Sequence, residues 1–186
     1  MKRLIPIILM IVFSGCAYVP QQASVQVDTD MVIESSIGGG KTVFVDFRDE
    51  RPSKSIGSRG LLGSGEITTE GDLAAEMHNA IENILEKQDF VPVTDNADAN
   101  LEVQLRAFEY DTSMGFWTGG IHLTALIKVI ATTDNGEYDN IYRYEDENRI
   151  VFVPFASENE KWLNEMANGL VEQIFKDRAL LNHLAE

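Results

Sequence analysis

The residues Ile121-His122-Leu123-Thr124-Ala125-Leu126-Ile127-Lys128-Val129-Ile130-Ala131-Thr132-Thr133-Asp134-Asn135-Gly136 carry the strongest structural signal in the chain. Every second residue from Ile121 to Ala131 is apolar, which is the period of a strand with one buried face. Asn135-Gly136 predicts a tight hairpin turn, because both central residues of such a turn take a positive φ. We therefore expect a long strand over 121–133 that returns as a second strand over 138–151.

The flanking segments extend this hairpin into a mixed domain. Leu101, Val103 and Leu105 alternate with polar residues and predict a third strand, so that the three strands form an antiparallel meander. Outside the meander we expect a strand over 42–47, a helix from about residue 73 that ends near Gln88, a short strand over 90–93, and a last helix that opens at Ser157 with Glu160 completing a capping box. The expected fold class is α+β, a two-layer sandwich of this meander plus one or two further strands, with two helices packed on one face.

The N-terminus has the composition of a secretory signal. Lys2 and Arg3 precede an apolar run over 4–13 that is too short to be a stable membrane span. Ser14-Gly15-Cys16 resembles the lipobox of bacterial lipoproteins, although Phe13 stands where that pattern usually has Leu. The resemblance implies cleavage between Gly15 and Cys16 and covalent acyl chains on Cys16. No other cofactor is expected.

We expect three regions along the chain. Residues 1–15 form the signal peptide, residues 16–40 form a lipidated cysteine with a flexible tether, and residues 41–186 form a single periplasmic domain. The tether is polar and ends in a glycine run, but Ser24-Val25-Gln26-Val27 alternates and could dock as an edge strand. Ala17 after the cysteine favours the outer membrane, with the domain on its periplasmic face.

The charge of the chain excludes one class of function. The 15 basic residues include Lys2 and Arg3, so that 13 basic residues remain against 30 acidic ones after cleavage, a net charge near −17. Nucleic-acid binding depends on clustered Lys and Arg, and we expect none. The same acidity argues against an electrostatic attraction to anionic lipid, so the acyl chains alone would have to attach the protein to the membrane.

Several segments together resemble the YajG-like family of bacterial outer-membrane lipoproteins. They are the lipobox, the strand and acidic turn over 43–52 with Ser55-Ile56-Gly57, the segment 97–103 and the terminal helix. The resemblance implies an outer-membrane-anchored periplasmic domain without established enzymatic activity, and it supplies no catalytic residue. The strong acidity and the long glycine-rich meander loop depart from the family pattern.

No catalytic or metal motif is recognisable. His78, His122 and His183 have no i, i+4 pairing, and Cys16 has no second cysteine. Gly63-Ser64-Gly65 lacks the spacing of a nucleophile elbow. Glu145-Asp146-Glu147 lacks the spacing of a calcium loop and is better explained as a solvated strand end. We therefore expect no enzyme and no metal.

Two segments are candidate partner-binding sites. Phe116 and Trp117 lie in a glycine-rich connection between two expected strands, and aromatic side chains are favoured anchors at interfaces. The alternative is that both fold back as cover for the core. The second segment is the loop over 48–65, which gathers Arg48, Arg51, Lys54 and Arg59 and could bind an acidic partner or a lipid head group. The alternative there is a solvated loop.

These observations favour a lipid-anchored, non-catalytic interaction or assembly module of the bacterial envelope. It would be tethered to the inner leaflet of the outer membrane and would bind an envelope protein. The alternative is a periplasmic carrier of a lipid or small ligand, which requires a cavity that the apolar helix faces leave unfilled.

Overall fold

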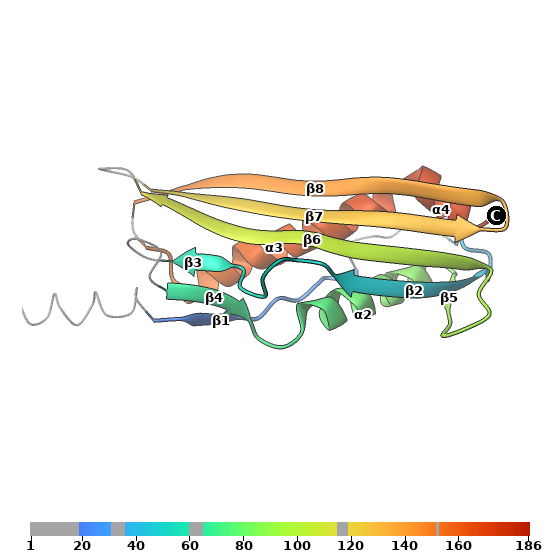
Figure 1. Cartoon of the computed structure of the whole chain (residues 1–186), viewed down its shortest axis with the longest axis horizontal. Helices are drawn as coiled ribbons and strands as arrows, with labels where there is room; N and C mark the ends of the chain where they lie inside the picture. Colours follow the sequence, from blue (N-terminus) through green and yellow to red (C-terminus); the bar gives the residue numbers. More distant parts are fainter. Residues whose placement is uncertain (1–18, 31–35, 60–64, 115–118, 152) are drawn as a thin grey trace, which may run out of the picture.

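The computed structural model describes residues 19–30, 36–59, 65–114, 119–151 and 153–186. The strands are β1 Gln21–Ala23, β2 Thr42–Asp49, β3 Gly57–Arg59, β4 Gly65–Thr69, β5 Val91–Pro92, β6 Ala99–Met114, β7 Gly119–Thr133 and β8 Gly136–Ile150. The helices are α2 Leu73–Lys87, α3 Ala156–Lys176 and α4 Arg178–Leu184. The expected α+β class is confirmed, and Figure 1 shows α3 and α4 behind the long strands β6, β7 and β8.

The strands form one mixed sheet. β6, β7 and β8 pair antiparallel in chain order, while β2 lies parallel to β6 from Val43 opposite Ala99 to Asp49 opposite Leu105. The remaining order is β1-β4-β3-β6-β2-β5. The expectation of one or two strands beyond the meander is wrong, because the described residues contain five, β1 to β5. The strands expected over 42–47 and 90–93 are present as β2 and β5. β1 and β3 have three residues each, too few to show a period in the sequence.

One face of β6 and β7 is lined with buried residues. The residues Ile121, Leu123, Ala125, Ile127, Val129 and Ala131 of β7 are all buried, as the alternation predicted. On β6 the register shifts between Leu105 and Ala107. Because this bulge adds one residue, the buried set changes from odd positions ending at Leu105 to Phe108 and Tyr110. A single hydrophobic core therefore runs the length of the sheet.

The two predicted helices are present as α2 and α3, with corrections at their ends. α2 is capped by Asp72, whose carboxylate accepts from the Ala74 N–H, and it ends before Gln88 as predicted. The predicted capping box of Ser157 and Glu160 is wrong, because α3 begins at Ala156 and the Glu158 carboxylate accepts from the Phe155 N–H at 3.0 Å. Among the described helices, none is both long and apolar enough to cross a bilayer.

The β7–β8 hairpin is present, but its turn differs from the predicted one. Thr133 pairs with Gly136, so the turn residues are Asp134 and Asn135. In this turn Gly136 alone has a positive φ, 137°. The glycine therefore serves the first position of β8 and not the second position of the turn.

Asp177 joins the C-terminal helices to the sheet. Its Oδ1 accepts from the N–H groups of Ala179 and Leu180 and so caps α4. Its Oδ2 accepts from the Tyr138 hydroxyl at 2.7 Å, the Tyr142 hydroxyl at 2.6 Å and the Asn140 amide at 3.0 Å. The predicted last helix is α3, and this carboxylate caps a further helix, α4, that the sequence pattern did not indicate.

Candidate functional site

Residues 21–28, which we call the N-terminal strap, lie along α3. The N–H groups of Gln26 and Asp28 donate to the Oδ1 atoms of Asn164 and Asn168, both at 2.8 Å, and the Ser24 N–H approaches Glu160 at 3.5 Å. Ala23, Val25 and Val27 between them are buried. Two strand residues advance about 6.6 Å and four helix residues about 6 Å, so alternate strap amides match side chains four apart on the helix.

A buried polar network fixes the start of the strap. The Gln21 Nε2 donates to the Ala156 carbonyl at 2.9 Å, and its Oε1 accepts from Arg59 at 2.9 Å and from the Asn159 Nδ2 at 2.8 Å. The Asn159 Oδ1 in turn accepts from the Tyr110 hydroxyl at 2.7 Å. Burial raises the pKa of Tyr110, so this hydroxyl keeps its proton and remains a donor. The first strap residue is therefore held at the N-terminus of α3.

The region assigned to a tether over 16–40 is thus largely in contact with the domain where the structure describes it. Beyond the strap, the Gly38 N–H donates to the Gln88 carbonyl and the Gly40 N–H to the Asp89 carbonyl. Four residues, 17–20, separate Cys16 from the strap. The signal that could have revealed the strap is the row Glu160, Asn164 and Asn168, which places polar residues at four-residue spacing along α3.

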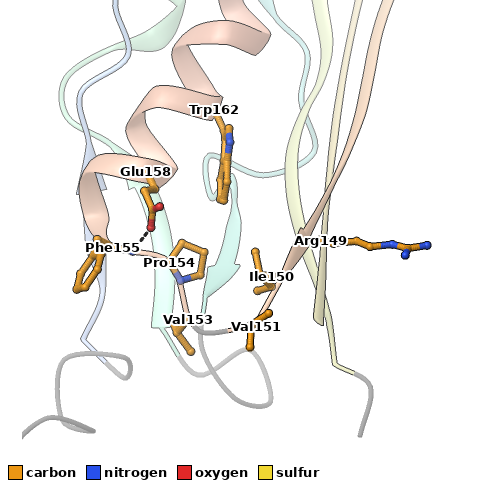
Figure 2. A pocket seen from close by; sticks show the side chains of 8 residues that line it. All are labelled: Arg149, Ile150, Val151, Val153, Pro154, Phe155, Glu158 and Trp162. Atoms are coloured by element: carbon orange, nitrogen blue, oxygen red, sulfur yellow. Dashed lines mark hydrogen bonds between the residues drawn. The ribbon is translucent and has the colours of Figure 1, made fainter. Parts of the chain in front are cut away.

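An apolar pocket of about 370 Å³ lies where β8 ends and α3 begins, beside the start of the strap. It is lined by Arg149, Ile150, Val151, Val153, Pro154, Phe155, Glu158 and Trp162. Figure 2 shows the Trp162 ring pointing toward the space between Pro154 and Ile150, with Arg149 pointing away. The Glu158 carboxylate is engaged by the Phe155 N–H, so the walls offer mainly apolar surface.

The basic residues predicted to form a docking loop have intramolecular partners. Arg48 lies beside Asp46 and Glu102, and Arg59 is buried and donates to Gln21. Arg51 and Asp49 form an ion pair at 2.9 Å whose side chains are 3% and 6% exposed, whereas Lys54 contacts the same carboxylate and is 76% exposed. Hydrogen bonds from Arg51 and Lys54 hold the pKa of Asp49 well below its usual range.

Four predicted site residues lie outside the described residues: Gly15, Cys16, Phe116 and Trp117. The structure does not test their assigned roles. Within the residues that it does describe, no three His, Cys, Asp or Glu side chains are grouped to hold a metal ion. The acidic residues 145–147 are exposed on β8.

The fold and the docked strap define a small α+β domain in which the strap begins, at Gln21, beside an apolar pocket. The chain belongs to the Lipoprotein_16 family, whose description is "uncharacterized lipoprotein" and whose model matches residues 29–185. This membership supports an envelope lipoprotein. No curated protein matches the chain.

Three solved structures share parts of this arrangement at low identity. A minor lipoprotein from Acinetobacter baumannii is 10% identical with a TM-score of 0.45, over 76% of this chain and 90% of that one. A Xanthomonas campestris protein is 14% identical with a TM-score of 0.46, over 85% and 94% of the two chains. A lipoprotein from Neisseria meningitidis is 12% identical with a TM-score of 0.33, over 72% and 97%.

Proposed function

We propose that this protein is a YajG-like, lipid-anchored, non-catalytic interaction module on the periplasmic face of the outer membrane. The docked strap is the observation that carries the proposal. Only residues 17–20 separate Cys16 from Gln21, and the five residue steps between the two span at most about 18 Å when extended. An acylated Cys16 would therefore hold the strap end of the domain next to the bilayer.

The outward face of the sheet is the surface that we assign to a protein partner. On this face the described side chains of β7 and β8 include the exposed His122, Thr132, Arg143, Glu145 and Glu147, while α3 and α4 contact the opposite side. An uncovered sheet face with mixed charges favours a polar partner surface. The expected partner is an envelope protein.

The free edge of β8 is less suited to strand addition. The Asn140 Oδ1 accepts from the Ile141 N–H at 2.8 Å, and the Asp146 Oδ1 accepts from the Glu147 N–H at 2.9 Å. The Gln173 amide donates to the Arg143 carbonyl at 3.1 Å. These side chains satisfy backbone groups that an added strand would need, so the face is preferred to the edge.

The experiment is site-directed photo-crosslinking in cells that make the anchored protein. A photoreactive residue replaces Glu145 on the outward sheet face, and the matched control replaces Asn83, an exposed residue of α2. We expect a reproducible protein adduct from position 145 that position 83 does not give. Equal adducts from both positions, or none, would contradict a partner on this face.

The anchor is tested separately by mass spectrometry of the mature N-terminus. We expect acyl chains on Cys16 and their loss, together with loss of membrane association, in Cys16→Ser. A Cys16→Ser protein that stays in the membrane fraction would remove the basis for anchoring.

The alternative of a lipid or small-ligand carrier draws support from the pocket beside Trp162. That pocket lies at the end of the domain, whereas the described side chains between the sheet and the helices form the buried core. A carrier should co-purify with a stoichiometric lipid or metabolite after extraction from the membrane, and an interaction module should not.

A further inference from the structure

Three exposed apolar side chains lie at the end of the domain where the strap and α3 begin and β8 ends. Val19, Val151 and Phe155 are 55%, 71% and 79% exposed. The other large apolar residues that are exposed in the described chain, Val91 and Ile141, lie away from this end, on β5 and within β8. Leaving such side chains in water is unfavourable, and a cluster of them marks a contact surface.

The same end carries the pocket. Val151 and Phe155 belong to its lining, and Trp162 stands inside it between α3 and the end of β8 (Figure 2). Trp and Phe side chains are favoured at membrane–water interfaces, because they combine a large apolar area with, for Trp, one N–H donor. The lining thus has the composition of a surface that contacts lipid.

The position of the proposed anchor indicates that a lipid bilayer is what contacts this surface. The Gln21 side chain is bonded to the Ala156 carbonyl, the residue directly after Phe155, so Cys16 is five residues of chain away from the pocket rim. Five extended residues reach at most about 18 Å. If acyl chains on Cys16 are inserted in one leaflet, Val19, Val151 and Phe155 would therefore lie at the surface of that leaflet.

We propose that this end of the domain, defined by Val19, Val151, Val153, Phe155 and Trp162, inserts into the membrane that holds the anchor and receives acyl chains of that leaflet in the pocket. The proposal rests on the proposed anchoring through Cys16. Contact occurs through apolar burial, since the chain without its signal peptide carries a net charge near −17 and is repelled by anionic head groups. Binding of this end to lipid without net charge is accordingly insensitive to salt.

The test places the acylated mature protein in phosphatidylcholine vesicles with brominated acyl chains. The chain has two tryptophans, so Trp117→Phe leaves Trp162 as the fluorescent probe in the pocket. We expect its fluorescence to be quenched in brominated vesicles and not in unbrominated ones, to the same extent at low and high salt. Val151→Asp and Phe155→Asp should each reduce the quenching, with the circular dichroism spectrum unchanged.

The matched control is Val91→Asp on β5, near the opposite end of the sheet (Figure 1). It introduces the same charge and should leave the quenching as it was. A protein that is acylated and floats with the vesicles, but whose Trp162 is not quenched, overturns the insertion and leaves the anchoring intact. Absence of acyl chains on Cys16 by mass spectrometry overturns both.

A third outcome separates insertion from a carried lipid. If brominated lipid remains bound in stoichiometric amount after the protein is extracted from the vesicles, and the two Asp variants do not change the quenching, the pocket holds an individual lipid. That result overturns contact with the bilayer and supports a carrier.

Discussion

The backbone N–H of Gln26 donates to the Oδ1 of Asn164 at 2.8 Å and joins residues 138 positions apart in the chain. Together with the Asp28–Asn168 bond, this contact changes the connection between Cys16 and the domain from a long tether into a short link. For a domain anchored through Cys16, as proposed, the orientation at the membrane would depend on two asparagines of α3, and this dependence can be measured.

Replacing both asparagines, Asn164→Ala and Asn168→Ala, should release the strap while the sheet stays folded. Each change removes one neutral hydrogen bond at an exposed site and costs about 1 kcal/mol. The measurement is amide hydrogen exchange, with faster exchange expected at Gln26 and Asp28 and unchanged rates along β7. Asn79→Ala, at an exposed position of α2, is the control. Unchanged protection at both strap amides would show that the valines alone hold the segment.

Asp177 should make the free energy of unfolding depend on pH in the acidic range. Burial by itself would raise the pKa of its carboxyl, but hydrogen bonds from Tyr142, Tyr138, Asn140 and the Leu180 N–H outweigh this and lower the pKa to about 2. Because the folded pKa lies below the unfolded value of 3.8, the stabilisation is complete above about pH 4 and is lost as the pH falls toward 2.

Asp177→Asn removes the charge and should cost about 1–3 kcal/mol in urea unfolding at pH 7. Between pH 4 and pH 2 the difference from the natural protein should shrink. A constant difference over this range would mean that the carboxylate is not the titrating group.

The ion pair of Asp49 and Arg51 should be structural. Asp49→Asn leaves the nearly buried Arg51 guanidinium without its counter-charge and should cost about 3–5 kcal/mol. Lys54→Ala removes an exposed cation from the same carboxylate and should change the unfolding free energy by at most about 0.5 kcal/mol. If Lys54→Ala instead abolishes crosslinks to a partner while stability is unchanged, the loop over 48–65 is a docking site after all.

Replacing Gly169 on α3 by alanine should destabilise the protein, although Gly→Ala within a helix usually stabilises. A Cβ there would lie 2.7 Å from the ring of Tyr144 on β8, so Gly169→Ala should destabilise by about 1–3 kcal/mol. When Tyr144→Ala has already removed the ring, the same Gly169→Ala change should stabilise by about 1 kcal/mol through helix propensity. Thermal or urea unfolding of the four proteins of this cycle gives the answer, and the same sign in both backgrounds would contradict the contact.

The long elements could be predicted because each shows its period within its own sequence. The β7 alternation and the α2 stripe from Leu73 to Leu85 both match the buried residues. The strap could not be assigned in the same way, because the alternation over 24–27 indicated a possible edge strand and gave no sign that the segment packs along α3. The parallel pairing of β2 with β6 is likewise set by tertiary packing.

Element ends were less predictable for a local reason. The turn at Asp134-Asn135 and the cap at Phe155 each differ by one or a few residues from the sequence pattern. The break at Asp177 depends on Tyr138 and Tyr142 of another strand, which no local rule includes. The pocket lies where β8 ends and α3 begins, and no pattern in the sequence indicated it.

The strap has a consequence for biogenesis. Residues 21–28 are synthesised and exported near the beginning, whereas Glu160, Asn164 and Asn168 come near the end of the chain. Contacts between segments so far apart form late, because the intervening loop must close first. The proposed acylated N-terminus would therefore be in the membrane before the strap can dock. The domain would be held close to the membrane only after α3 has been exported and has folded against the strap.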